Sequence, residues 1–207
     1  LDTYVDALVT AKDRGLPLLF GLEVDHLPGA TGAMAALLAD YPFDILLGSV
    51  HWLDAWLFDA YDDATFAHEW DRRDTDGVYR TYVDAIIDLA RSGTVDVLAH
   101  LDVIKVAGHL PTDPGEHEDR LVDAILDTDI VVEFSSAGLR KPADDTYPGR
   151  RLLRRLVDGG VSLTTSSDGH IVEHVGHAFD RLRDDLDTLG VTTLTTFDQR
   201  RPETRPI

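Results

Sequence analysis

The stretch Ser166-Ser167-Asp168-Gly169-His170 decides the fold of this chain, because it marks the point where a strand ends and a loop begins. It follows Val161-Ser162-Leu163-Thr164-Thr165, an apolar and β-branched run that predicts a buried strand. It precedes residues 171–189, whose apolar residues have helical spacing. In a β/α barrel the loops at the carboxyl ends of the parallel strands meet at one mouth, where the chemistry takes place. A carboxylate and an imidazole at that mouth can share a metal ion or a reacting water.

The composition limits the class of protein. The chain has 207 residues, 43% of them hydrophobic, which is enough for a single domain over residues 1–207 with a sizeable core. No apolar run approaches the ~20 residues of a membrane-spanning helix and no signal peptide is recognisable, so we expect a cytoplasmic protein. Without cysteine, the side chains left to bind a metal are His, Asp and Glu. The formal net charge of −19 argues against general binding to nucleic acid, which needs a basic surface.

Predicted strands and predicted helices alternate along the chain. Apolar runs predict strands at residues 16–24, 44–50, 95–99, 130–134, 161–165 and 191–197, the first of them buried on both faces. Three-to-four spacing predicts helices at residues 2–14, 30–40, 75–91, 116–127, 148–158 and 171–189. The Arg- and Pro-rich end is expected to be a tail. This alternation is typical of parallel βαβ units in an α/β fold, and because six strands are too few for a closed eight-stranded barrel, we expect an incomplete barrel.

Five consecutive predicted strands end in residues that can bind a metal. These residues are Glu23 with Asp25, His51, His100 with Asp102, Glu133, and Asp168 with His170. Each of them alone is more simply explained as a capping carboxylate or a histidine at the edge of the core. Because the carboxyl ends of parallel strands lie at one rim, the five together predict a polynuclear metal site. Carboxylates mixed with imidazoles suit Zn, Mn or Fe, and a carboxylate can bridge two ions.

Longer motifs surround the same strand ends. They are Gly-Leu-Glu-x-Asp (21–25), Gly-Ser-Val-His (48–51), Asp-Val-Leu-Ala-His-Leu-Asp (96–102), Glu-Phe-Ser-Ser-Ala-Gly-Leu-Arg-Lys-Pro (133–142) and Ser-Asp-Gly-His (167–170). In this order they resemble the histidinol-phosphatases of the PHP (polymerase and histidinol phosphatase) family, over nearly the whole chain. The resemblance implies a distorted (β/α)7 TIM-like barrel that holds two to three divalent metal ions. It also implies an enzyme that hydrolyses L-histidinol phosphate to L-histidinol and phosphate in histidine biosynthesis, by attack of metal-bound hydroxide.

The resemblance assigns roles to individual residues. The metal ligands would be Glu23, as the bridging ligand, and His51, His100, Asp168 and His170. Asp168 and His170 are also the expected catalytic residues, and Asp168 could accept or return a proton beside the metals. Arg140 would hold the substrate phosphate with its planar fork of donors, and Lys141 and Asp25 are the other candidates for substrate binding. Glu133 is left outside the metal ligands, because it could equally support them.

The chain departs from the family pattern at its start. The family begins with a His-x-His motif on its first strand and has another histidine after the second, and neither is present here, so we expect a barrel that is N-terminally incomplete. Three hypotheses stay open: a phosphatase of histidinol phosphate, a related phosphoesterase acting on nucleotides or oligonucleotides, and a metal-poor barrel remnant without catalysis. The expected partner is a small phosphate ester, with no nucleic acid and no membrane, and the oligomeric state is left open. The remaining histidines singled out, His68, His109, His117, His174 and His177, are expected at the surface.

Overall fold

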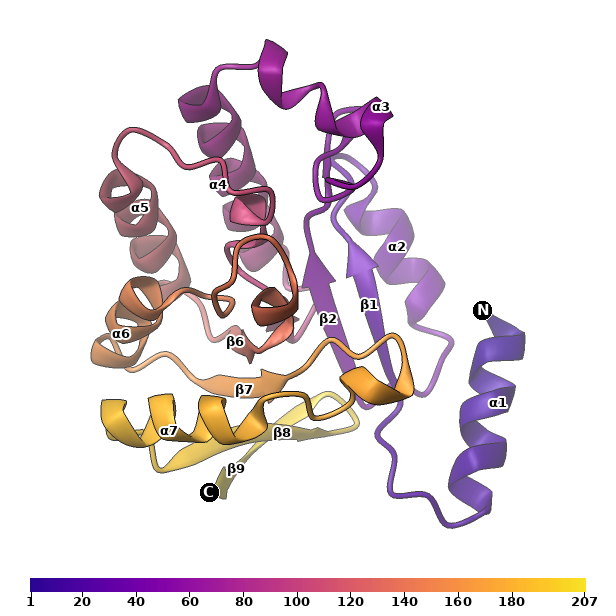
Figure 1. Ribbon diagram of the computed structural model, residues 1–207. Coiled ribbons are helices and arrows are strands. Elements are labelled where there is room, and N and C mark those ends of the chain that lie inside the picture. Colours follow the sequence, from indigo (N-terminus) through magenta and orange to yellow (C-terminus); the bar gives the residue numbers. More distant parts are fainter.

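A five-stranded parallel sheet forms the centre of the protein (Figure 1). The computed structural model describes residues 1–207, apart from the side chain of Thr65. The strands lie in the order β1 (Gly21–Asp25), β2 (Ile45–Ser49), β5 (Val97–Leu98), β6 (Val131–Ser135) and β7 (Leu163–Ser166). Each neighbouring pair is parallel, so a crossover connects every strand to the next one in the sheet. β1 and β7 are the two edges, and the predicted α/β fold with an incomplete barrel is confirmed.

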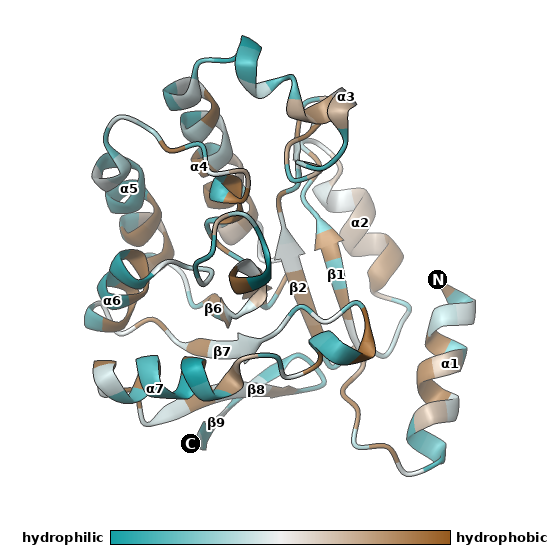
Figure 2. Ribbon diagram, viewed as in Figure 1, coloured by the Kyte–Doolittle hydropathy of each residue, from teal (hydrophilic) through white to brown (hydrophobic). Residues whose placement is uncertain are grey.

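Helices cover one face of this sheet. They are α2 (Thr31–Leu38), α4 (Thr75–Ser92), α5 (Pro114–Leu126), α6 (Arg150–Asp158) and α7 (Phe179–Leu189). α4 shows why such segments are helical: Asp74 caps its first turn by accepting from the backbone N–H of Gly77, and Gly93 ends it in a left-handed conformation. α7 buries Leu182 and Leu186, while the side seen in Figure 2 is largely hydrophilic. The amphipathic pattern of the sequence therefore corresponds to burial against the sheet.

The two faces of the sheet have different neighbours. Leu46, Leu98 and Val132 belong to the main core that the helices complete. Val97 and Val131 point the other way and pack with Phe197 in a second apolar cluster. Since side chains alternate along a strand, the register puts Glu23 in one row with Leu47, Val97 and Val131, on the face away from the helices. The face that carries Glu23 is thus apolar at its base and polar toward the carboxyl ends of the strands.

The first predicted strand is shorter than expected. Residues 16–20 precede β1 and are not part of it, and Leu16 and Leu19 are about half exposed, at 52% and 48%. The prediction of a strand buried on both faces is therefore wrong for this segment, because β1 is an edge strand and has only β2 as a partner among the described strands. The preceding helix α1 (Asp2–Asp13) has no buried residue and is joined to β1 by the Tyr4 hydroxyl, which donates to the Gly21 carbonyl.

The carboxyl-terminal region differs from the prediction in two ways. Residues 171–178 are not helical throughout: a short 3-10 turn, η4 (Val172–His174), precedes α7, and Val172 and Val175 are exposed at 84% and 72%. The expected tail is a strand, β9 (Arg201–Pro206), paired antiparallel with β8 (Thr193–Asp198). Its prolines fit an edge strand, where a missing N–H donor is tolerated. The sixth predicted strand therefore exists, as β8, but it lies in this hairpin and not in the parallel sheet.

Aromatic side chains hold the long connection between β2 and α4. It contains the antiparallel pair β3 (Trp52–Leu53) and β4 (Trp56–Leu57), the helix α3 (Ala64–Ala67) and the 3-10 turn η1 (Trp70–Arg72). Trp56 is buried between Phe58 and Trp70, with ring centroids at 6.2 and 4.9 Å. These aromatics therefore pack the loop. Among the described helices, none is long and apolar enough to cross a lipid bilayer.

Candidate metal centre and active site

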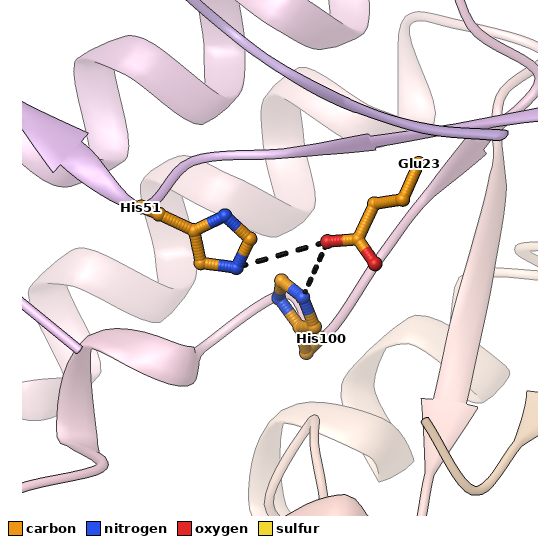
Figure 3. Close-up of side chains that lie close together, drawn as sticks. All are labelled: Glu23, His51 and His100. Atoms are coloured by element: carbon orange, nitrogen blue, oxygen red, sulfur yellow. Dashed lines mark hydrogen bonds and ion pairs between the residues drawn. The ribbon is translucent and has the colours of Figure 1, made fainter. Parts of the chain in front are cut away.

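Three potential metal ligands from three strand ends converge on one point. Glu23 lies in β1, His51 follows β2, and His100 follows β5. Their ligand atoms all lie within 4.8 Å of one another (Figure 3). His100 Nε2 is 3.0 Å from Glu23 Oε1, and His51 Nε2 is 3.7 Å from the same oxygen. The parallel sheet thus brings together side chains that are up to 77 residues apart in the chain.

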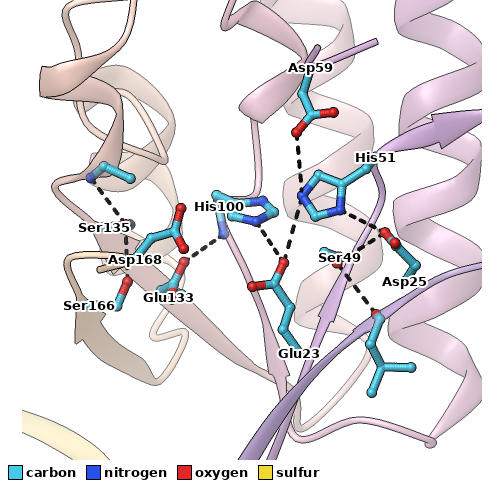
Figure 4. Close-up of polar contacts among 12 residues, drawn as sticks. Glu23, Asp25, Ser49, His51, Asp59, His100, Glu133, Ser135, Ser166 and Asp168 are labelled. Atoms are coloured by element: carbon cyan, nitrogen blue, oxygen red, sulfur yellow. Dashed lines mark hydrogen bonds and ion pairs between the residues drawn. The ribbon is translucent and has the colours of Figure 1, made fainter. Parts of the chain in front are cut away.

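Asp25 fixes the orientation of the His51 ring. Its Oδ1 lies 2.7 Å from His51 Nδ1, and the Ser49 hydroxyl donates to the same oxygen at 3.4 Å (Figure 4). A carboxylate accepts only, so Nδ1 of His51 donates its hydrogen to Asp25. In neutral His51 the other nitrogen, Nε2, is then an acceptor that faces Glu23 Oε1 at 3.7 Å and Asp59 Oδ2 at 3.9 Å. His51 Nε2 and Glu23 Oε1, two acceptors that face one another, would be stabilised by a cation between them.

His100 and Glu23 are strongly coupled. His100 is 4% exposed, and its backbone N–H donates to the buried carboxylate of Glu133 at 2.8 Å. Burial lowers the pKa of His100, but the hydrogen bond and the charge of Glu23 outweigh it and raise the pKa to about 9. Burial likewise raises the pKa of Glu23, but the hydrogen bond and the charge of His100 lower it to about 2. Burial also raises the pKa of Glu133. Nδ1 of His100 is buried without a hydrogen-bond partner.

These residues line an open cleft of about 480 Å³, a size typical of small-molecule sites. The lining residues are Glu23, Asp25, Ser49, His51, Asp59, His100, Lys141, Asp168 and His170. Ser49 and Asp59 are not among the residues singled out from the sequence. Asp59 follows the β3–β4 pair, and burial raises its pKa, with the charge of His51 acting in the opposite direction. Ser49 could have been found, since it precedes His51 by two residues on a strand end, but no local pattern marks Asp59.

Asp168 and His170 reach the same cleft from the end of β7. Asp168 has a left-handed backbone, with φ at 46°, which directs its side chain across the sheet toward His100 (Figure 4). His170 has a side chain that is 80% exposed, and its Nδ1 lies 3.3 Å from Asp168 Oδ1. Both residues line the cleft, but they lie outside the compact group formed by Glu23, His51 and His100.

Arg140 and Lys141 occupy a loop that leaves β6 and returns to it. Ser135 and Tyr147 exchange two backbone hydrogen bonds, of 2.6 and 3.0 Å, and so close the loop that contains η3 (Ala137–Arg140). Lys141 lines the cleft, as a substrate-binding residue would. Arg140 does not line it. Its Nη2 donates to the backbone carbonyls of Ser167 and Asp168, at 2.7 and 3.2 Å, and thereby holds the turn that carries Asp168.

Two of the histidines expected at the surface lie elsewhere. His117 is 6% exposed, in α5 beside Tyr79, and His109 is partly buried and stacks on Trp70 with a centroid distance of 4.5 Å. The prediction is wrong for both, because the ring of His117 packs on Tyr79 while Glu116 and Asp119 beside it are exposed, and the ring of His109 stacks on Trp70. His68 and His177 are exposed and His174 is half-buried. None of these five residues lines the cleft.

The arrangement around Glu23 fits a divalent metal ion. The group offers one carboxylate and two imidazoles, the ligands that Zn, Mn and Fe accept. One imidazole, that of His51, is oriented by a carboxylate on its far nitrogen, as is usual for histidines that bind metals. His51 Nε2 and Glu23 Oε1, the two acceptors that face one another, would also be stabilised by a positive charge. The residues present therefore fit the group that the sequence predicts.

The chain has relatives of known sequence and structure. The family model described as PHP domain matches residues 1–137. A protein from Deinococcus radiodurans named "Probable histidinol-phosphatase" is 34% identical over 187 residues, which are 90% of this chain and 70% of that protein. A protein of the same name from Schizosaccharomyces pombe is 24% identical over 219 residues, covering 96% of this chain and 69% of that one.

The fold has a counterpart among solved structures. The crystal structure of a histidinol phosphate phosphatase from Lactococcus lactis, complexed with zinc, L-histidinol and phosphate, superposes with a TM-score of 0.77. The match covers 97% of this chain and 77% of that one at 18% identity, so it supports the fold. With the family model and the 34% identical relative, it confirms the resemblance predicted from the strand-end motifs. The chain therefore belongs to the PHP domain family and is related to hydrolases named histidinol-phosphatases.

Proposed function

We propose that this protein is a metal-dependent phosphatase that hydrolyses L-histidinol phosphate to L-histidinol and phosphate. The observation that carries the proposal is the convergence of Glu23, His51 and His100 at the base of a cleft that Lys141 also lines. The relatives named histidinol-phosphatases, and the presence of zinc, L-histidinol and phosphate in the Lactococcus lactis structure, support the substrate.

Glu23, His51 and His100 would hold a divalent ion, and we propose that Asp168 and His170 contribute to a second or third one on the same cleft. Zn, Mn and Fe are the candidates for this donor set. Such ions supply Lewis acidity at the phosphate and lower the pKa of water from ~16 toward ~7. Asp25 supports this site by keeping Nε2 of His51 turned toward Glu23.

The other residues of the cleft would act on substrate and proton. Lys141 would attract the phosphate into a cleft that is otherwise lined by carboxylates and imidazoles. In the reaction the P–O bond to the substrate alcohol breaks, and water supplies an oxygen to phosphorus and a proton to the alcohol. Asp168 and His170, whose Oδ1 and Nδ1 lie 3.3 Å apart at the rim, would move that proton.

The test combines metal content with phosphate release. The purified protein, reconstituted with Zn, Mn or Fe, is expected to retain metal and to release phosphate from L-histidinol phosphate. His100→Ala is expected to lose most of both, because it removes a ligand and the partner of Glu23. His68→Ala is the matched control, since the side chain of His68 is 71% exposed and lies outside the cleft. Wild-type protein that binds metal but releases no phosphate from this ester would contradict the proposed substrate.

A further inference from the structure

One oxygen of a carboxylate in the cleft has no hydrogen-bond partner among the described residues. Asp59 lies in the loop after β4, and its side chain is 31% exposed. Its Oδ1 is enclosed and meets no hydrogen-bond donor among the described residues. The contact of its Oδ2 with His51 Nε2 is 3.9 Å long, beyond hydrogen-bond distance (Figure 4). An enclosed carboxylate oxygen without a donor is costly unless a positively charged group completes it.

The other carboxylates at the base of the cleft are engaged. Asp25 accepts from His51 at 2.7 Å, and Glu23 accepts from His100 at 3.0 Å. Asp168 lies 3.3 Å from the His170 ring. Asp25 was a candidate for substrate binding from the sequence, but its Oδ1 accepts from His51 and Ser49. Asp59 is the carboxylate that remains for a cation brought by the substrate.

A positive group stands close to Asp59. Lys141 lines the same cleft, and its Nζ lies 5.9 Å from the ring of Tyr61, two residues beyond Asp59. No ion pair joins Lys141 to Asp59 within the described part of the chain, so both charges face the cleft. A ligand that satisfies both has a negative and a positive group a few bonds apart.

We propose that Asp59 binds the ammonium group of the substrate and that, with Lys141, it selects phosphate esters of vicinal amino alcohols. This inference rests on the proposed phosphatase function and adds the substrate class. A phosphate on one carbon and an ammonium group on the next match the neighbouring cation and anion. Nucleoside monophosphates have no aliphatic ammonium group and leave Asp59 unsatisfied, so the cleft discriminates against them.

The experiment compares two esters that differ only in the amine. L-Histidinol phosphate and its deamino analogue, 3-(imidazol-4-yl)propyl phosphate, are assayed with wild type, Asp59→Asn and Asp62→Asn. Asp59→Asn is expected to lower kcat/KM for L-histidinol phosphate at least tenfold and to leave kcat/KM for the analogue within twofold. Asp62 is exposed in the same loop and does not line the cleft, so its variant is the control and should match wild type with both esters.

Metal content is measured in the same samples. Equal losses of kcat/KM for the two esters, or loss of bound metal in Asp59→Asn, would overturn the proposal, because either outcome gives Asp59 a role at the metal centre. If wild type hydrolyses neither ester, the phosphatase function fails, and binding decides the role of Asp59 separately. Calorimetric titration with L-histidinol should then show at least tenfold weaker binding to Asp59→Asn, with unchanged binding of the deamino alcohol. Equal binding of L-histidinol to wild type and variant would reject the role of Asp59.

Discussion

His51 donates the hydrogen of Nδ1 to Asp25 across 2.7 Å, and this contact turns Nε2 of the same ring toward Glu23. The two residues come from neighbouring strands whose ends are in register, Asp25 beside Ser49. Asp25 would therefore act on the proposed metal centre through another side chain. A carboxylate in this position fixes both the tautomer and the direction of the histidine, which strengthens it as a ligand.

Asp25→Asn is expected to weaken metal binding by about 10–100-fold, because an amide holds the Nδ1 hydrogen less firmly than a carboxylate does. The measurement is a competition titration of the metal against a chelator of known affinity. Asp40→Asn changes the net charge equally at an exposed site outside the cleft and should bind metal as wild type does. Unchanged affinity in Asp25→Asn would show that the ring of His51 is oriented by its packing alone.

The pair of Glu23 and His100 gives the metal-free protein a stability that depends on pH. The pKa of His100 is raised from 6.5 to about 9, so its contribution is complete below about pH 6.5 and is lost as the pH rises through 9. The pKa of Glu23 is lowered from 4.5 to about 2, so its contribution is present above about pH 4.5 and is lost as the pH falls through 2. Thermal unfolding of metal-free protein should show a lower Tm at pH 9.5 than at pH 6. In His100→Gln the difference should shrink, and an equal drop in both proteins would assign it to other groups.

Arg140 offers a direct test between two roles. The phosphate clamp expected from the sequence predicts that Arg140→Met raises KM without changing stability. The contacts of Arg140 with the carbonyls of Ser167 and Asp168 predict a loss of about 1–3 kcal/mol in the free energy of unfolding, because buried acceptors lose a charged donor. Denaturant unfolding of the metal-free variant measures the second effect. Lys141→Met, which alters a residue that lines the cleft, should raise KM with little change in stability.

Lys105 is expected to be important for the stability of the fold. Its ammonium group contacts Asp102 at 2.9 Å and Asp145 at 2.7 Å, donates to the Thr146 carbonyl, and has a side chain that is only 13% exposed. Lys105→Met leaves two carboxylates without their cation, so we expect a loss of about 3 kcal/mol in the free energy of unfolding. Lys12→Met, at an ion pair of 3.8 Å with a half-exposed lysine, should change it by less than about 1 kcal/mol. Equal effects of the two substitutions would contradict a structural role for Lys105.

The sequence predicted the parallel sheet and the convergence of Glu23, His51 and His100, because both depend on local patterns. Apolar runs mark the strands, and the residue that follows each run marks the rim. Where the structure of a segment depends on residues far away in the sequence, its prediction was less successful. Residues 16–20 are as apolar as a buried strand, yet within this segment it is Phe20 whose backbone carbonyl accepts from β2, and Leu16 and Leu19 are about half exposed. Pro202 and Pro206 suggested a tail, but an edge strand tolerates them.

The positions of Asp59 and Arg140 show the same limit at the site. Asp59 reaches the cleft because the β3–β4 pair and the aromatics around Trp56 fold its loop back toward His51. Nothing in the aromatic- and Asp-rich stretch around Asp59 indicates that path. Arg140 stands in a motif that predicts phosphate binding, but its guanidinium is turned toward the backbone beside Asp168. The motif thus marked Arg140 as an important residue but did not predict which atoms its side chain contacts.

The loop between Ser135 and Tyr147 begins and ends at the same place, since these two residues bond to each other. Two residues within this closed loop support the framework, since Arg140 holds the turn that carries Asp168 and Asp145 pairs with Lys105. Exchanges elsewhere in the loop that keep these contacts leave the framework unchanged. The loop carries Lys141 to the cleft, whereas Glu23, His51 and His100 belong to the sheet and its strand ends. Evolution, or a designer, could therefore exchange the loop residues that face the cleft, provided that the contacts of Arg140 and Asp145 are kept. Glu23, His51 and His100 would stay unchanged, and the range of esters that the cleft accepts could change independently of them.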